Sequence, residues 1–232
     1  MSGAQDDWDA LGDRLLGVRE QSRLTLDLCF NEMLDRPDAR QRFICYMVQT
    51  YHYVSFACPL MERMLAKREA LPAAMVGYLE QNLIEEAGHE QWVLDDLERL
   101  GMERNRVRNS MPLRQTTTLV GSQYFWIEKA QPAVCFGYMF TLERTAATPE
   151  LHRAGISRLS DRLGIKMEAL SNYIRHGELD FDHQNDKIEL LNKVKLETDV
   201  GEAILQNCRN TTLNLCDLFV EIAEMPASQL QQ

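Results

Sequence analysis

The run His176-Gly-Glu-Leu-Asp180-Phe-Asp-His183 places three metal-binding side chains at offsets of 0, 4 and 7 residues. An α-helix has about 3.6 residues per turn, so these positions share one stripe of a helix. Two imidazoles and a carboxylate on one stripe predict a metal site, although a polar helical face with histidines is also typical of a solvated surface. Gly177 lies inside the run and predicts a bend or break of the helix before Asp180.

A second segment, Asn82-Leu-Ile-Glu85-Glu86-Ala-Gly-His89, contains Glu-x-x-His. On one helix, Glu86 and His89 would lie one turn apart on the same face, as in the di-iron and di-manganese sites of helical bundles. Helical periodicity places Glu86 on the apolar stripe and Glu85 at its rim. The alternative is a surface pair three residues apart, but a carboxylate on a buried stripe is costly unless something pairs with it.

Glu143 is the third candidate, because on a helix it shares a face with Phe136, Met139 and Phe140. A salt bridge to Arg144 is the alternative for this residue alone. Together the segments offer three carboxylates and three imidazoles from three predicted helices, the ligand count of two iron ions with open positions. Such donors suit Fe(II) or Mn(II), and also Zn. The predicted metal ligands are Glu86, His89, Glu143, His176, Asp180 and His183.

The remaining histidines are His52 and His152, because the chain has only five. We interpret His52, between Tyr51 and Tyr53, as a hydrogen-bonded pocket or core residue rather than a ligand.

The segments that must position these residues read as helices almost throughout, since apolar residues recur at steps of three and four. Pro72 and Gly101 bracket one of the helices, and Gln131-Pro132 interrupts another. We predict an all-α protein with a single domain over residues 1–232 and frayed ends at about 1–6 and 226–232. The expected helices cover about 8–34, 38–67, 72–101, 117–148, 154–177, 180–196 and 199–223.

Composition excludes several classes of function. The net charge is −10 without a Lys/Arg cluster, which argues against a nucleic-acid or anionic-membrane surface. The six cysteines form no C-x-x-C pair and read as small buried thiols of a reducing compartment. No apolar stretch is long enough to span a membrane or to form a leader, so we expect a soluble, cytoplasmic protein.

The chain resembles the heme-oxygenase-like di-iron oxidases and oxygenases, which are seven-helix proteins of similar length. The resemblance covers nearly the whole helical order and is specific at residues 82–89, at Glu143 and at residues 176–183. It implies a seven-helix heme-oxygenase-like bundle in which the six predicted ligands hold two Fe(II) ions. It also implies O2 as co-substrate and, where the reaction requires one, an external electron donor. Glu143 and Asp180 are the favoured bridging or shifting carboxylates by this resemblance.

One position departs from part of that family. Some members take the first carboxylate seven residues before the histidine, where this chain has Asn82. Others use Glu-x-x-His, as in the bacterial decarboxylase that makes a terminal alkene from a fatty acid. By that resemblance Glu86 is the ligand, and whether Glu85 is an additional one stays open.

The substrate is expected to be a small molecule, and aromatic side chains are the candidates for its pocket, although each is also typical of a core. The candidates are Tyr51, Tyr53, Phe56, Tyr124 and Phe136. An aromatic cavity suits a small amine, so N-oxygenation of a small amino compound is the favoured reaction. A long tunnel of Leu and Met would suit the alternative, oxidative decarboxylation or desaturation of a fatty or amino acid.

Two other classes of protein remain. A metal-free thiaminase-like hydrolase would need a nucleophilic cysteine, for which Cys135 and Cys58 are the candidates. A non-enzymatic helical protein is the other alternative. The sequence permits a homodimer without predicting one.

Overall fold

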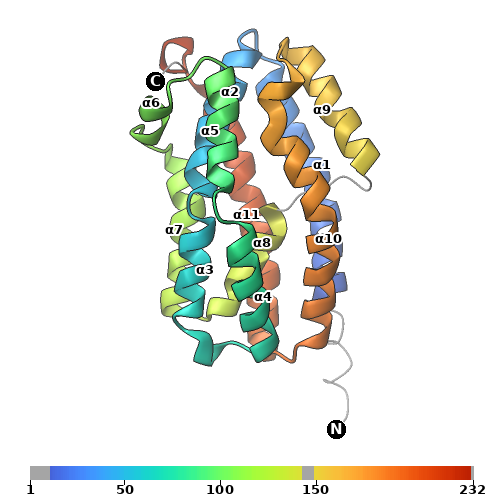
Figure 1. Cartoon of the computed structure of the whole chain (residues 1–232). Coiled ribbons are helices and arrows are strands. Elements are labelled where there is room, and N and C mark those ends of the chain that lie inside the picture. The colour runs from blue at the N-terminus through green and yellow to red at the C-terminus, as the bar shows by residue number, and fades with distance from the viewer. Residues whose placement is uncertain (1–10, 143–148, 231–232) are drawn as a thin grey trace.

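The computed structural model describes residues 11–142 and 149–230, apart from the side chains of residue 149 and of residues 178–185. Over this part of the chain, helices follow one another and no strand occurs (Figure 1). The prediction of an all-α bundle is confirmed. No helix in the described part is long and apolar enough to cross a membrane.

Helix α11 (Thr198–Glu224) is the centre of the bundle, and it packs against α1 (Leu11–Leu34), α7 (Arg114–Lys129) and α8 (Phe136–Leu142). Its buried side chains recur at steps of three and four residues, which keeps one continuous stripe turned toward the other helices. Members of this stripe are Ile204, Cys208, Thr211, Leu215, Leu218 and Ile222. The core that they join extends from Leu11 to Leu230.

The helices that carry the candidate ligands belong to two layers of the bundle (Figure 1). In one layer α2 (Ala39–Val54) packs on α5 (His89–Arg99), and α3 (Ala57–Leu65) packs on α4 (Ala73–Glu85). In the other, α10 (Ser171–Lys193) lies against α1, α5 and α9 (Pro149–Leu163). Short helices lie between these elements: η1 (Arg68–Ala70), α6 (Arg104–Arg108), η2 (Pro132–Cys135) and η3 (Met167–Leu170). A further short helix, η4 (Ala227–Gln229), follows α11.

The prediction of one continuous helix over 72–101 is wrong, because the segment forms two helices. It begins after Pro72 and ends before Gly101 as expected, but it divides into α4 and α5 at residues 86–88. Gly88 has a φ of 91°, which a glycine adopts at little cost because it has no Cβ. The predicted helix over 38–67 divides in the same way, at residues 55–56.

The predicted helices over 154–177 and 180–196 also have the wrong limits. The chain turns at Gly164, where φ is 59°, and α10 then continues from Ser171 through Gly177 to Lys193. The expected break inside the His-x3-Asp-x2-His run is therefore absent. The break at Gln131-Pro132 is confirmed, since α7 ends at Lys129 and η2 begins at Pro132.

Candidate metal centre

Glu86 and His89 meet across a turn between two helices rather than along one helix. Glu86 is the C-cap residue of α4, and His89 is the first residue of α5. The left-handed backbone of Gly88 separates the two helices, and Oε2 of Glu86 lies 2.9 Å from Nδ1 of His89. Both side chains are largely buried. The turn thus supplies the carboxylate and imidazole pair that the sequence predicted by continuous helical geometry.

His176 joins this pair from the opposite layer of the bundle. Its ring centroid lies 4.9 Å from that of His89, with the two rings nearly perpendicular. Trp92 stacks on His89 at 3.8 Å and also meets the edge of His176 at 5.6 Å. The guanidinium of Arg175 covers the Trp92 ring at 5.0 Å. The indole therefore fixes the orientation of both imidazoles, a role that the sequence analysis missed.

Positive charge surrounds the Glu86 carboxyl. Burial by itself raises the pKa of Glu86, but contact with His89 and the charges of His89, His176 and Lys187 outweigh it, so the pKa is lower than usual. Lys187 is fully buried, and its Nζ lies 5.7 Å from the centre of the Tyr78 ring. It sits eleven residues after His176, three turns along α10, on the stripe of the predicted ligands. The periodicity that identified the histidines could have identified this lysine.

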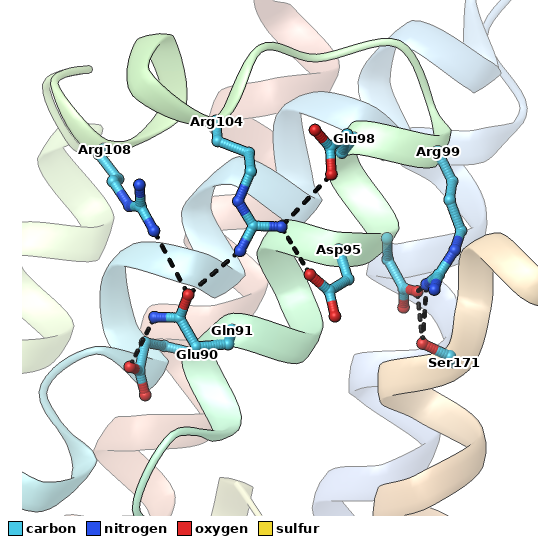
Figure 2. Close-up of polar contacts among 9 residues, drawn as sticks. Glu90, Gln91, Asp95, Glu98, Arg99, Arg104, Arg108 and Ser171 are labelled. Atoms are coloured by element: carbon cyan, nitrogen blue, oxygen red, sulfur yellow. Dashed lines mark hydrogen bonds and ion pairs between the residues drawn. The ribbon is translucent and has the colours of Figure 1, made fainter.

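Asp96 joins the two layers that carry the histidines. Its side chain is fully buried and lies seven residues after His89 on α5. It accepts hydrogen bonds from the Ser171 hydroxyl at 2.6 Å and from the backbone N–H of Asn172 at 2.7 Å. Arg99 adds an ion pair at 2.9 Å (Figure 2). The first turn of α10 is therefore anchored to α5, which sets the position of His176 relative to His89.

The outer face of α5 is held by a second polar network (Figure 2). Arg104 of α6 pairs with Asp95 at 2.5 Å and with Glu98 at 3.4 Å, and it donates to the Gln91 side chain at 3.1 Å. Arg108 also donates to Gln91, at 3.4 Å. These contacts lie on the surface side of α5, whereas Asp96 and His89 point into the bundle.

Three of the six predicted ligands have described side chains, namely Glu86, His89 and His176. Glu143 lies outside the described residues, and the side chains of Asp180 and His183 lie outside them too. The backbone of α10 is continuous from Ser171 to Lys193, so residues 176, 180 and 183 share one face of this helix. Among the described side chains, no group of three or more His, Cys, Asp and Glu residues is placed so that it could hold a metal ion.

The donor chemistry of the described residues fits iron. A carboxylate with a lowered pKa and two imidazoles are the oxygen and nitrogen donors that Fe(II) accepts in proteins. They come from α4, α5 and α10, and a metal ion held by them would need further donors to complete its coordination sphere. Asp180 and His183, one and two turns along α10, and Glu143 after α8 are the candidates for these donors.

Asn82 and Glu85 occupy different environments. Asn82 is buried beside the site, and its Nδ2 donates to the Tyr78 hydroxyl at 3.0 Å. Glu85 accepts from Nε2 of Gln81 at 2.5 Å on the exposed side of α4. This contact does not support Glu85 as an additional metal ligand, which stays a hypothesis.

A cavity of about 510 Å³ adjoins the candidate ligands and has Glu86 and His176 in its wall. Part of the wall is apolar, with Leu60, Met61 and Met139 among its residues. Another part carries the hydroxyl groups of Tyr46, Thr50 and Tyr53. The Tyr53 hydroxyl lies 3.3 Å from that of Tyr46 and donates to the Thr50 hydroxyl at 3.2 Å. The cavity can therefore hold a small molecule with both apolar and polar parts next to the ligands.

Only Tyr53 of the five predicted pocket aromatics lies in the described wall of this cavity. Phe136 is fully buried in the core, and Phe56 and Tyr124 pack edge to face away from it. Tyr51 is half-buried and contacts His52. Helical spacing does not reveal which apolar face meets a cavity. Most of the residues in the cavity wall were not among the predicted pocket residues. His52 makes a hydrogen bond to the Ser110 hydroxyl at 2.9 Å.

The candidate thiols are poorly placed for nucleophilic chemistry. Cys135 is fully buried, and burial raises the pKa of its thiol to about 12. Burial also raises the pKa of Cys58, and the carboxylates of Glu86, Glu90 and Glu62 raise it further. No cysteine is among the described residues that line the cavity.

A family model described as iron-containing redox enzyme matches residues 45–213, a span that contains every predicted ligand. The chain belongs to this family of iron-containing redox enzymes. The family match agrees with the donor set around Glu86, His89 and His176 and suggests iron as the metal. No curated protein matches the chain in sequence.

Solved structures with the same fold include a domain of unknown function with a heme oxygenase-like fold from Shewanella denitrificans OS217. It has a TM-score of 0.77 and 20% identity over 90% of this chain and 91% of that one. A TenA homologue from Pseudomonas syringae pv. tomato has a TM-score of 0.67 and 12% identity over 92% of both chains. A TenA homologue from Pyrococcus furiosus has a TM-score of 0.67 and 14% identity over 92% of this chain and 99% of that one. These similarities show a heme oxygenase-like fold, as the sequence predicted.

Proposed function

We propose that this protein is a non-heme di-iron oxygenase that uses O2 to oxidise a small amino compound, with N-oxygenation as the reaction. The observation that carries the proposal is that Glu86, His89 and His176, from α4, α5 and α10, lie close together, with Glu86 and His176 in the wall of a cavity large enough for a substrate. Membership of the iron-containing redox enzyme family supports iron as the metal.

Glu86, His89, His176, Glu143, Asp180 and His183 would hold two Fe(II) ions, which would supply the activation of O2. The protein's own residues have three tasks. The pKa of the Glu86 carboxyl is lower than usual, which favours the ionised form that a metal ion binds. Trp92 keeps the two imidazoles in orientation, and the burial of His89 and Glu86 limits access of water from the α5 side.

The overall reaction sets what else must be supplied. In N-oxygenation of a primary amine to a hydroxylamine, one oxygen atom bonds to nitrogen. One N–H bond is replaced by N–O, and the product carries one O–H bond. The other oxygen atom is reduced to water, which takes two electrons from an external donor and two protons from solvent. An electron donor is therefore part of the proposal.

Oxidative decarboxylation or desaturation by the same residues is the second candidate. The observation that favours it is the apolar part of the cavity wall, where Leu60, Met61, Met139 and Leu159 could line an alkyl chain. The hydroxyl groups of Tyr46, Tyr53 and Thr50 favour a polar substrate instead. We favour N-oxygenation because these hydroxyl groups lie in the cavity wall together with the candidate ligands.

Iron binding tests the proposed site. The purified protein is loaded anaerobically with Fe(II), and bound iron is measured after gel filtration. We expect about two ions per chain, with a large loss in His89→Ala and His176→Ala. His52→Gln is the matched control, since His52 is half-buried like His176 but bonds to Ser110 away from the site. If the wild type retains no iron, or if the ligand variants retain as much as the control, the di-iron proposal is wrong.

The reaction itself is tested with isotopically labelled O2. The iron-loaded protein is incubated with a chemical reductant and a panel of amines, amino acids and fatty acids, and products are analysed by mass spectrometry. N-oxygenation predicts one labelled oxygen atom in the amine product. Loss of CO2 or of two hydrogens without labelled oxygen in the organic product would support the second candidate and reject the first.

A metal-free hydrolase of the thiaminase type receives no support from the cysteines, although TenA homologues share the fold. A nucleophilic cysteine requires an accessible thiol with a pKa near or below its ordinary value. Cys135 is buried with a raised pKa, and Cys58 is not among the cavity-lining residues.

A further inference from the structure

His152 lines the same cavity but is not one of the predicted ligands. It lies on α9, and its imidazole packs directly on the backbone of α10 beside His176. Its Nε2 is 2.8 Å from the carbonyl oxygen of Tyr173. This histidine has no role in the predicted ligand set, and its contact with α10 gives it a defined orientation.

The partner of Nε2 determines what the other ring nitrogen can do. A carbonyl oxygen only accepts hydrogen bonds, so Nε2 of His152 must carry the hydrogen. In the neutral ring Nδ1 then has a lone pair and accepts. None of the described residues donates a hydrogen bond to this Nδ1, and it belongs to a side chain in the cavity wall. His152 thus presents an acceptor for an N–H or O–H group of a bound molecule.

Gly177 makes this arrangement sterically possible. A Cβ at position 177 would lie 2.0 Å from Cδ2 and 2.2 Å from Nε2 of the His152 ring, distances that no side chain tolerates. The glycine inside the His176-Gly177 dipeptide therefore serves close approach of an imidazole. It does not break the helix, because α10 is continuous there.

Two further polar groups in the cavity wall lack a side-chain partner. The Tyr138 hydroxyl and Oδ1 of Asn172 are buried and have no hydrogen-bond partner among the described residues, and both side chains are about 97% and 96% buried, respectively. The Tyr138 hydroxyl can donate or accept, and Oδ1 of Asn172 accepts, so both can bond to an N–H group of a ligand whose orientation His152 sets. Leaving such groups unsatisfied is costly, and a polar ligand group in the cavity would remove that cost.

The charged residues in the cavity wall are arranged differently. Arg23 and Arg158 are both exposed, and Arg23 is paired with Glu20 at 3.0 Å and with Asp27 at 3.8 Å. The polar group beside α10, Nδ1 of His152, is thus an acceptor, whereas the cationic side chains Arg23 and Arg158 are exposed. A carboxylate placed at Nδ1 would face a lone pair, but an amine or ammonium group would donate to it.

We propose that His152 is a substrate-binding residue whose Nδ1 accepts a hydrogen bond from the substrate's amino group, so that the cavity selects an amine over a carboxylate of the same chain length. The inference rests on the proposed function for the reaction that follows binding. It assigns to Gly177 the task of admitting the imidazole, and to Tyr138 and Asn172 that of completing the polar end of the cavity.

The test measures binding of two matched probes, hexylamine and hexanoate, to the anaerobic Fe(II)-loaded protein by calorimetry. We expect the wild type to bind hexylamine more tightly, and His152→Ala to lose about tenfold or more of that affinity, as expected for a hydrogen bond to a charged group. Affinity for hexanoate and iron content should not change. Equal affinity of the wild type for both probes, absence of binding, or an unchanged His152→Ala variant would overturn the inference.

Gly177→Ala gives an independent arm, because it keeps His152 but displaces its ring. We expect the same loss of amine affinity as in His152→Ala, and no further loss when the two changes are combined. Gly121→Ala is the helix control, since a Cβ there meets no atom within 4 Å. A combined variant that loses the sum of both effects would contradict the shared mechanism.

The tautomer is observed directly by long-range proton–nitrogen NMR of the five histidines, with His152 assigned by its absence in His152→Ala. We expect hydrogen on Nε2, and hydrogen on Nδ1 in the neutral ring would overturn the inference. Failure of the proposed function is distinguishable from failure of this inference. A protein that binds no iron but prefers hexylamine through His152 keeps the binding role, whereas an iron-loaded protein without the preference loses it.

Discussion

The anchor between α5 and α10 predicts a large difference between two neighbouring aspartates. Asp96 is fully buried and accepts from Ser171, Asn172 and Arg99. Asp95 keeps 41% of its side chain exposed and pairs with Arg104 on the surface. The matched changes are Asp96→Asn and Asp95→Asn, which have the same chemistry one residue apart on the same helix.

The expected magnitude follows from the hydrogen bonds of Asp96. Asparagine keeps one acceptor oxygen and replaces the other with an NH2 group, which cannot accept from Ser171 or Arg99. A hydrogen bond to a charged group contributes about 1.5–3 kcal/mol, and the remaining bond to Asn172 N–H weakens with loss of the charge. The Arg99 pair adds little because that guanidinium is half-exposed. We therefore expect Asp96→Asn to lower the free energy of unfolding by about 2–4 kcal/mol. For Asp95→Asn we expect about 0–1 kcal/mol.

Urea denaturation followed by circular dichroism measures both values under identical conditions. At this chain length the Asp96 change corresponds to a fall in melting temperature of about 5–12 °C. A double-mutant cycle with Ser171→Ala should show coupling in Asp96→Asn and none in Asp95→Asn. Because α10 carries His176, Asp96→Asn should also weaken Fe(II) binding.

The reasoning is refuted if the two aspartate variants lose the same stability, or if Asp96→Asn shows no coupling to Ser171. In either case the α5–α10 anchor would not contribute to the position of His176. A loss of stability without weaker iron binding would keep the anchor but remove its link to the site.

Three further predictions concern other parts of the chain. Gly88→Ala should cost about 1–2 kcal/mol in urea denaturation, because its φ of 91° is strained for alanine, and should weaken iron binding, whereas Gly121→Ala should do neither. Burial lowers the pKa of His52 from 6.5, so the folded state binds fewer protons and the stability present above about pH 6.5 is lost as pH falls toward the folded pKa. The urea midpoint of His52→Gln should therefore fall less on acidification than that of the wild type, and an equal fall would contradict this assignment. Cys45 and Cys135, with pKa values raised to about 11 and about 12, should react with a thiol reagent only after unfolding, so rapid labelling of either in the native protein would contradict their burial.

Local sequence was sufficient for the class of the protein and for part of the site. Steps of three and four residues identified the helices because an α-helix imposes that period on any buried stripe. The same rule put His176 on one face of α10 together with positions 180 and 183, and the Glu-x-x-His spacing predicted that Glu86 and His89 lie close together. Pro72, Gly101 and Pro132 marked helix limits through their own backbone constraints.

Contacts between segments far apart in the chain were decided only by the tertiary structure. Gly177 read as a helix breaker because its freedom is visible in sequence, while its contact with His152, 25 residues away, is not. The approach of His89 to His176 depends on the anchor at Asp96, and the cavity wall depends on which helical faces meet. Periodicity assigns each side chain to a face of its own helix, but packing and buried hydrogen bonds determine which faces come together.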